Sequence, residues 1–112
     1  MRKLIVIALA ACALAALTAT AFAATKSVKV GDDYYVRPSG VPKVTVTKGT
    51  TVKWRFVGDS PHTATVSKGP VKFNSGVKTS GTYSKKMKKR GTYTIYCTIH
   101  GASTQKMKLV VK

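Results

Sequence analysis

The chain has 112 residues, of which 20 are lysine or arginine and only three are acidic, and its formal net charge is +17. A chain of this length forms one small domain with a modest core, which excludes a multidomain architecture. The positive charge favours anionic partners. No nucleic-acid-binding motif is present, so we expect no nucleic-acid partner.

Residues 1–23 have the pattern of a secretory signal peptide. A basic pair after the first methionine is followed by an apolar run over residues 4–17 and by a small-x-small cleavage site that ends at Ala23. This run is too short for a transmembrane anchor, so we expect cleavage near Ala23, a mature domain over residues 24–112, a periplasmic or secreted location and no stable membrane insertion. The stretch that ends at Cys12 also resembles a lipoprotein cleavage box, but the apolar run before it is short.

Alternation of apolar and polar residues dominates the rest of the chain and predicts short strands. In chain order the predicted strands cover residues 27–30, 34–36, 43–47, 51–56, 62–66, 83–87, 92–97 and 106–112. Glycine and proline separate them, and no segment has a convincing helical period. Seven or eight short strands at this spacing predict an all-β fold, a Greek-key β-sandwich or barrel. Lysines at outward positions keep such a fold soluble and protect its edge strands.

Cleavage leaves one cysteine, which cannot form a disulfide within the chain. Cys97 shares the inward face of its strand with Ile95, and His62 shares a face with Ala64, while His100 follows the cysteine by three residues. A thiolate and two imidazoles suit copper in both oxidation states. Zinc could use the same three ligands, although a structural zinc site usually has a fourth. Taken singly, each residue is also compatible with an ordinary core position.

Two segments resemble the cupredoxins, and among them the plastocyanin-like proteins. Residues 58–63 (Gly-Asp-Ser-Pro-His-Thr) are similar to the segment that delivers the first histidine of that family just after a proline. Residues 91–101 are similar to its Gly-x-Tyr-x-Φ-Tyr-Cys-x-x-His segment, where Φ is apolar. The resemblance extends over most of the mature chain and implies an eight-strand Greek-key β-sandwich with one type 1 copper at one end. It implies that His62, Cys97 and His100 are the three strong copper ligands.

The fourth, axial ligand departs from the family pattern. Plastocyanin-like proteins usually have a methionine five residues after the second histidine, where this chain has Gln105. The nearest methionine is Met107, which continues the inward face of Leu109 and Val111 and is therefore expected in the core. We predict Gln105 as the axial ligand, with Met107 as the alternative. An amide oxygen is a harder donor than a thioether, so it should favour Cu(II) and lower the reduction potential.

The resemblance also indicates where electrons would enter and leave. Tyr96 has outward parity and is bonded directly to Cys97, so Tyr96 and the edge of His100 are candidate electron ports. An exposed strand tyrosine that packs on a neighbour is the alternative for Tyr96. We expect basic residues to surround this port, namely Lys85, Lys86, Lys88, Lys89 and Arg90, and therefore redox partners with an acidic docking surface.

These inferences predict a small exported monomer that carries single electrons on one type 1 copper between redox proteins, and that is not an enzyme. A protein that delivers or sequesters copper with the same ligands is the alternative. A copper nitrite reductase or oxidase would need a second copper site and more histidines than this chain has. A metal-free β-sandwich adhesion or binding module is the remaining alternative.

Overall fold

The computed structural model describes residues 24–36 and 41–112, so the predicted signal peptide and Cys12 lie outside the described residues. The described residues form eight strands and no helix. The strands are β1 (Thr25–Gly31), β2 (Tyr34–Tyr35), β3 (Lys43–Val46), β4 (Thr51–Phe56), β5 (Thr65–Lys68), β6 (Thr82–Lys86), β7 (Gly91–Tyr96) and β8 (Lys106–Val111). Within those two ranges, nothing has the form of a helix long and apolar enough to cross a membrane.

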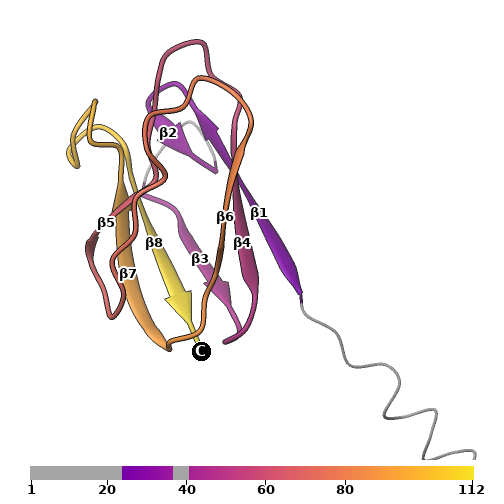
Figure 1. Ribbon diagram of the computed structural model, residues 1–112. Helices are drawn as coiled ribbons and strands as arrows, with labels where there is room; N and C mark the ends of the chain where they lie inside the picture. The colour runs from indigo at the N-terminus through magenta and orange to yellow at the C-terminus, as the bar shows by residue number, and fades with distance from the viewer. Residues whose placement is uncertain (1–23, 37–40) are drawn as a thin grey trace, which may run out of the picture.

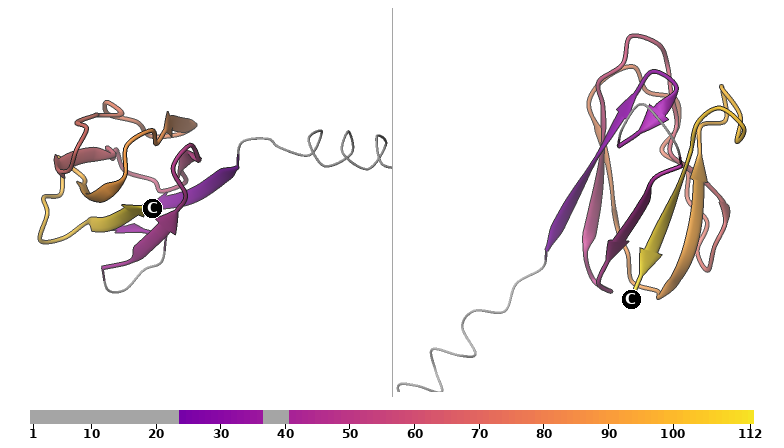
Figure 2. Two further views of the ribbon diagram at one scale, coloured as in Figure 1. Left: turned by 90° about the horizontal axis from the view of Figure 1, so that it is seen from below. Right: turned by 180° about the vertical axis from the view of Figure 1, so that it is seen from behind.

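The strands form two four-stranded sheets, with the orders β2-β1-β4-β6 and β3-β8-β7-β5 (Figure 1). The pairs β1–β4 and β3–β8 are parallel, and the other pairs are antiparallel. Figure 2 shows the two layers from behind and from one end. The predicted all-β sandwich of seven to eight strands is thereby confirmed.

The core lies between the two sheets and follows the predicted alternation. In β4 the side chains of Val52, Trp54 and Phe56 are buried, and in β7 those of Tyr93 and Ile95 are buried. Each large apolar side chain buried in this way stabilises the fold by about 1.5–3 kcal/mol. The pattern of burial therefore explains why the two sheets pack with these faces together.

The predicted strand over residues 62–66 is wrong in its first half. β5 begins only at Thr65, and His62 makes a single isolated bridge to Lys78. His62, Thr63 and Ala64 are all buried, and three consecutive buried side chains cannot belong to one face of a regular strand. The inward placement of His62 is nevertheless correct, because its side chain is 1% exposed.

Three segments meet at one end of the sandwich, which we call the histidine end: the β1–β2 turn, the segment 57–64 and the loop 97–105 (Figure 1). The turn 87–90 and the C-terminus lie at the other end, which we call the lysine end. The histidine end therefore collects residues from distant parts of the sequence.

Candidate metal centre

The three predicted strong ligands converge at the histidine end. His62, Cys97 and His100 each offer one ligand atom, and these atoms all lie within 4.8 Å of one another. Cys97 Sγ lies 3.3 Å from His100 Nδ1 and 3.9 Å from His62 Nδ1. The two imidazole rings lie 4.8 Å apart at 33°. His62 and Cys97 are buried, whereas the His100 side chain is 23% exposed.

A tight turn places Cys97 and His100 on the same side of the loop 97–105. The Gly101 N–H donates to the Cys97 carbonyl at 2.8 Å, which closes one helix-like turn, and residues three apart on such a turn share a face. Gly101 ends the turn with φ +84°, a left-handed conformation that glycine adopts at little cost. The Cys97 N–H donates to the Gln105 carbonyl at 3.2 Å and closes the base of the loop.

Hydrogen bonds of the His62 and Thr63 backbone and of the Thr63 side chain hold His62 in place. Its backbone exchanges two hydrogen bonds with Lys78, at 3.0 and 2.9 Å. The Tyr35 hydroxyl donates to the Thr63 carbonyl at 2.6 Å, and the Thr98 N–H donates to Thr63 Oγ1 at 3.0 Å. Thr63 therefore ties the histidine segment to the cysteine loop. Strand parity places Thr63 outward, so this role was not predicted from the sequence.

Gln105 is fully buried, and its carboxamide is oriented by the β1–β2 hairpin. Its Nε2 donates to the carbonyls of Gly31 at 3.0 Å and Tyr34 at 2.8 Å. Two carbonyl partners require the nitrogen on that side, so Oε1 points inward and lies 2.9 Å from His62 Nδ1. Met107 is buried among the core side chains and pairs with Ile95 across the β7–β8 ladder.

Two carboxylates that were not predicted as site residues lie beside the histidines. Asp32 Oδ1 lies 2.9 Å from His62 Nε2, and Asp33 Oδ1 lies 3.6 Å from His100 Nε2. Both face the ring nitrogens that point away from Cys97. Asp32 is 30 residues from His62, so no local motif could have indicated the contact. The one available signal was that two of only three acids follow each other in a turn.

Protonation at the centre follows from these contacts. Burial alone would raise the pKa of Cys97, but the backbone N–H groups of His100 and Thr63 and the imidazoles of His100 and His62 lower it to about 7. Burial opposes the charged form of His62, yet its hydrogen bonds to Asp32, Cys97 and Gln105 outweigh burial and raise its pKa. The hydrogen bond from His62, together with the N–H groups of Asp59 and Ser60, holds the pKa of Asp32 well below its usual range.

Both ring nitrogens of His62 face hydrogen-bond acceptors. Its Nδ1 faces the carbonyl oxygen of Gln105 and its Nε2 faces the carboxylate of Asp32, and both partners are acceptors. A metal at the centre would take the place of any proton on Nδ1. A soft thiolate that ionises near neutral pH, two imidazole Nδ1 atoms and a carbonyl oxygen at a fourth side fit copper in both oxidation states.

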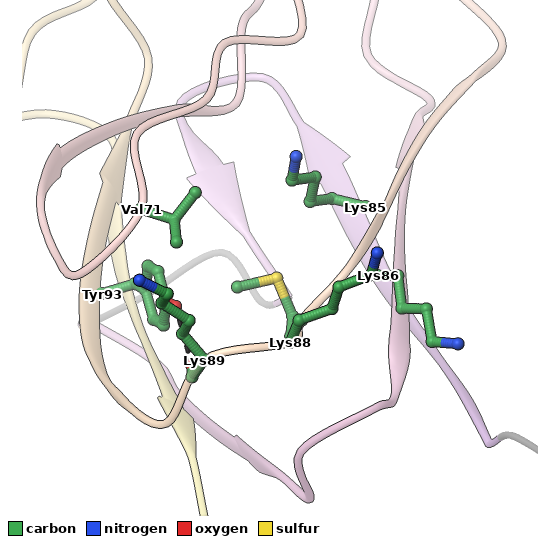
Figure 3. Close-up of a pocket in the computed structure, with 7 residues that line it drawn as sticks. Val71, Lys85, Lys86, Lys88, Lys89 and Tyr93 are labelled. Carbon is green, nitrogen blue, oxygen red and sulfur yellow. Dashed lines mark hydrogen bonds between the residues drawn. The ribbon is translucent and has the colours of Figure 1, made fainter.

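The structure corrects the expected surroundings of Tyr96. Tyr96 is half-buried at the histidine end of β7, opposite Lys106 and Thr65. The basic run 85–90 does not surround it, because that run ends at the lysine end of the sandwich. There its lysines line a hollow of about 350 Å³ with Val71 and Tyr93 (Figure 3). The hollow is therefore separate from the histidine end.

No protein-family model and no curated protein matches this sequence. The chain is similar to an amicyanin variant with glutamine in place of a methionine, in the Cu(I) form, at 25% identity over 81% of this chain and 90% of that one, with a TM-score of 0.65. It is similar to a purple cupredoxin from Nitrosopumilus maritimus at 18% identity over 78% of this chain and 99% of that one, with a TM-score of 0.64. A copper-containing nitrite reductase from Thermus scotoductus SA-01 has 20% identity over 79% of this chain and a TM-score of 0.63, but the chain spans only 22% of that protein.

The fold and the geometry of the centre agree with each other. A β-sandwich similar to cupredoxins carries a thiol and two imidazoles within reach of one ion. The chain is therefore cupredoxin-like, and its His62, Cys97 and His100 are positioned to form a type 1 copper site.

Proposed function

We propose that the protein carries single electrons on one copper ion held by His62, Cys97 and His100. The observation that carries this proposal is the convergence of Cys97 Sγ with two Nδ1 atoms, buried except for the partly exposed ring of His100. Bound copper would supply a one-electron couple between Cu(I) and Cu(II). The buried side chains exclude water and hold the donors in place, and the partly exposed ring of His100 offers a short route to a partner.

We further propose Gln105 Oε1 as the axial donor. Its support is the orientation of the carboxamide, which directs Oε1 toward His62 Nδ1 while Nε2 is engaged by two backbone carbonyls. Met107 is the weaker candidate because its side chain fills the core. Because an amide oxygen is harder than a thioether, the proposed site has a lower reduction potential than a site with methionine.

We propose His100 as the main electron port and Tyr96 as a secondary one. His100 is partly exposed at the end where the ligand atoms lie, whereas Tyr96 is half-buried beside Lys106. Because the lysines of residues 85–90 lie at the other end of the sandwich, we propose instead that acidic groups of a redox partner face Lys106 on the Tyr96 side. An association rate that did not fall with ionic strength would count against that electrostatic docking.

The first test is to add Cu(II) to the purified protein and to record visible absorption and electron paramagnetic resonance spectra. We expect an intense thiolate-to-copper band and one copper per chain. Cys97→Ser should lose the band, while Ser75→Ala, which removes a hydroxyl that contacts Ala64, should keep it. A folded wild-type protein without the band would refute the proposal.

The second test separates an electron carrier from a copper-delivery protein with the same ligands. The copper-loaded protein is oxidised and reduced repeatedly and then mixed with a metal-free copper acceptor. A carrier keeps its copper through both treatments, whereas a delivery protein loses it to the acceptor. The proposed carrier is exported, so the chain recovered outside the cytoplasm should begin at Ala24, which N-terminal sequencing would establish.

A further inference from the structure

The turn between β1 and β2 brings one carboxylate to each candidate histidine ligand. Asp32 Oδ1 lies 2.9 Å from His62 Nε2, and Asp33 Oδ1 lies 3.6 Å from His100 Nε2. Asp33 has φ 66°, a left-handed conformation that is uncommon for a residue with a side chain. The turn therefore adopts an unusual backbone at the point where it meets both histidines.

The segment 58–60 encloses the Asp32 carboxylate. Oδ2 accepts a hydrogen bond from the Asp59 N–H at 3.0 Å, and Oδ1 accepts from the Ser60 N–H at 3.1 Å and the Ser60 hydroxyl at 2.8 Å. A Cβ atom at Gly58 would collide with Asp32 Oδ1 and would lie 2.9 Å from the Asp32 backbone nitrogen. Gly58 thus leaves the space that Asp32 occupies. These contacts hold the Asp32 carboxylate in place beside His62 Nε2.

Metal-bound histidines in proteins almost always donate their second ring nitrogen to a carboxylate, a carbonyl or a water, which fixes the tautomer and makes the ligating nitrogen a stronger donor. At His62 the required geometry is present, because Asp32 engages Nε2 and Nδ1 faces the other ligand atoms. The contact at His100 is longer, and the Asp33 side chain is 63% exposed, so water screens it more.

We propose that Asp32 is a positioning residue that orients His62 with Nδ1 toward the metal and lowers the reduction potential of the copper, and that Asp33 does the same to a lesser degree at His100. This inference rests on the proposed copper site. The third acid, Asp59, also lies at this end, but it contacts the turn through its backbone N–H, which donates to Asp32 Oδ2. Asp59 therefore offers a matched control: the same charge at the same end, with no histidine contact among the described residues.

The first experiment needs no copper and measures the exchange of the His62 Nε2–H proton by NMR in the metal-free protein. In the wild type and in Asp59→Ala this proton is expected to exchange slowly, because it is buried in a hydrogen bond. In Asp32→Ala it should exchange fast, and in Asp32→Asn, whose carbonyl oxygen can still accept, it should remain slow. Equal exchange in Asp32→Ala and Asp59→Ala would overturn the positioning role.

The second experiment measures the reduction potential of the copper-loaded variants. Loss of such a carboxylate typically weakens metal binding 10- to 100-fold, and a tenfold loss of Cu(II) over Cu(I) affinity raises a one-electron potential by about 59 mV. We expect about this rise for Asp32→Ala, a smaller rise for Asp33→Asn and none beyond the general charge effect for Asp59→Ala. Asp32→Asn should restore the wild-type copper spectrum but not the wild-type potential.

Gly58→Ala provides an independent route, because it retains the charge of Asp32 while displacing its carboxylate. It should raise the potential and speed proton exchange in the same direction as Asp32→Ala. If Asp32→Ala and Gly58→Ala have the same reduction potential as Asp59→Ala, the proposed effect of the Asp32 carboxylate on the copper potential is refuted. If the wild type binds no copper, the proposed function fails, but the NMR experiment still decides whether Asp32 positions His62.

Discussion

Replacing Gln105 by methionine should raise the reduction potential and destabilise the metal-free protein at the same time. The potential rises because a thioether favours Cu(I) more than an amide oxygen does. The stability falls because Gln105 Nε2 is the donor to the carbonyls of Gly31 and Tyr34. Methionine has no donor to replace it.

The size of the destabilisation follows from the two lost hydrogen bonds. Gly31 and Tyr34 face each other in the β1–β2 ladder and keep that pairing, so each lost bond costs about 0.5–1.5 kcal/mol and the two together lower the free energy of unfolding by about 1–3 kcal/mol. Changes of this size are measurable by urea denaturation of the metal-free protein.

Met107→Leu is the matched control for Gln105→Met. It changes a fully buried core side chain with nearly conserved volume, which usually costs less than about 1.5 kcal/mol, and it should leave the potential unchanged. A Gln105→Met protein with an unchanged potential would refute axial ligation by Gln105. If Gln105→Met leaves the free energy of unfolding unchanged, the two hydrogen bonds of the Gln105 carboxamide are refuted, independently of the measured reduction potential.

Copper binding should release protons in acid, because a Cys97 pKa of about 7 leaves the thiol protonated below that pH and because the pKa of His62 is raised by its hydrogen bonds. Copper affinity should therefore fall as the pH drops below 7, by up to about tenfold per pH unit for each proton displaced, which calorimetric titration in buffers of different ionisation enthalpy would measure. In the metal-free protein the depressed pKa of Cys97 contributes stability at alkaline pH, above the unfolded value near 9, and this contribution should disappear as the pH falls through 7. Gly101→Ala should cost about 1–2 kcal/mol in urea denaturation through left-handed backbone strain alone, since nothing lies within 4 Å of the added methyl; an unchanged midpoint would contradict the turn at Gly101. Thr63→Val should lower stability by about 1–3 kcal/mol, because the Thr98 N–H loses its acceptor, and Ser67→Ala, with an exposed hydroxyl contact, should not.

The sequence was sufficient to predict the strands and the three strong ligand candidates. Period-two alternation reports which side chains face the core, so β4, β7 and β8 were placed closely, and Cys97 was correctly turned inward. Parity also identified Met107 as a core residue. Parity was less reliable at residues 62–64, where His62 makes one isolated bridge to Lys78 and no regular strand ladder forms.

The sequence predicted poorly whatever depends on contacts between distant segments. The lysines of residues 85–90 were expected beside Tyr96, but the antiparallel return of the chain carries them to the opposite end of the sandwich. The orientation of the Gln105 carboxamide depends on two carbonyls more than 70 residues away.

Local patterns determined the candidate ligand types of this protein, since Cys97 and His100 lie in the turn that follows one strand. The tertiary structure alone decided their surroundings, because the β1–β2 turn reaches His62 only when β1 pairs with β4, the strand that leads into the segment 57–64. Hydrogen bonds that orient a ligand act through space over about 3 Å, and no periodicity along the chain records them.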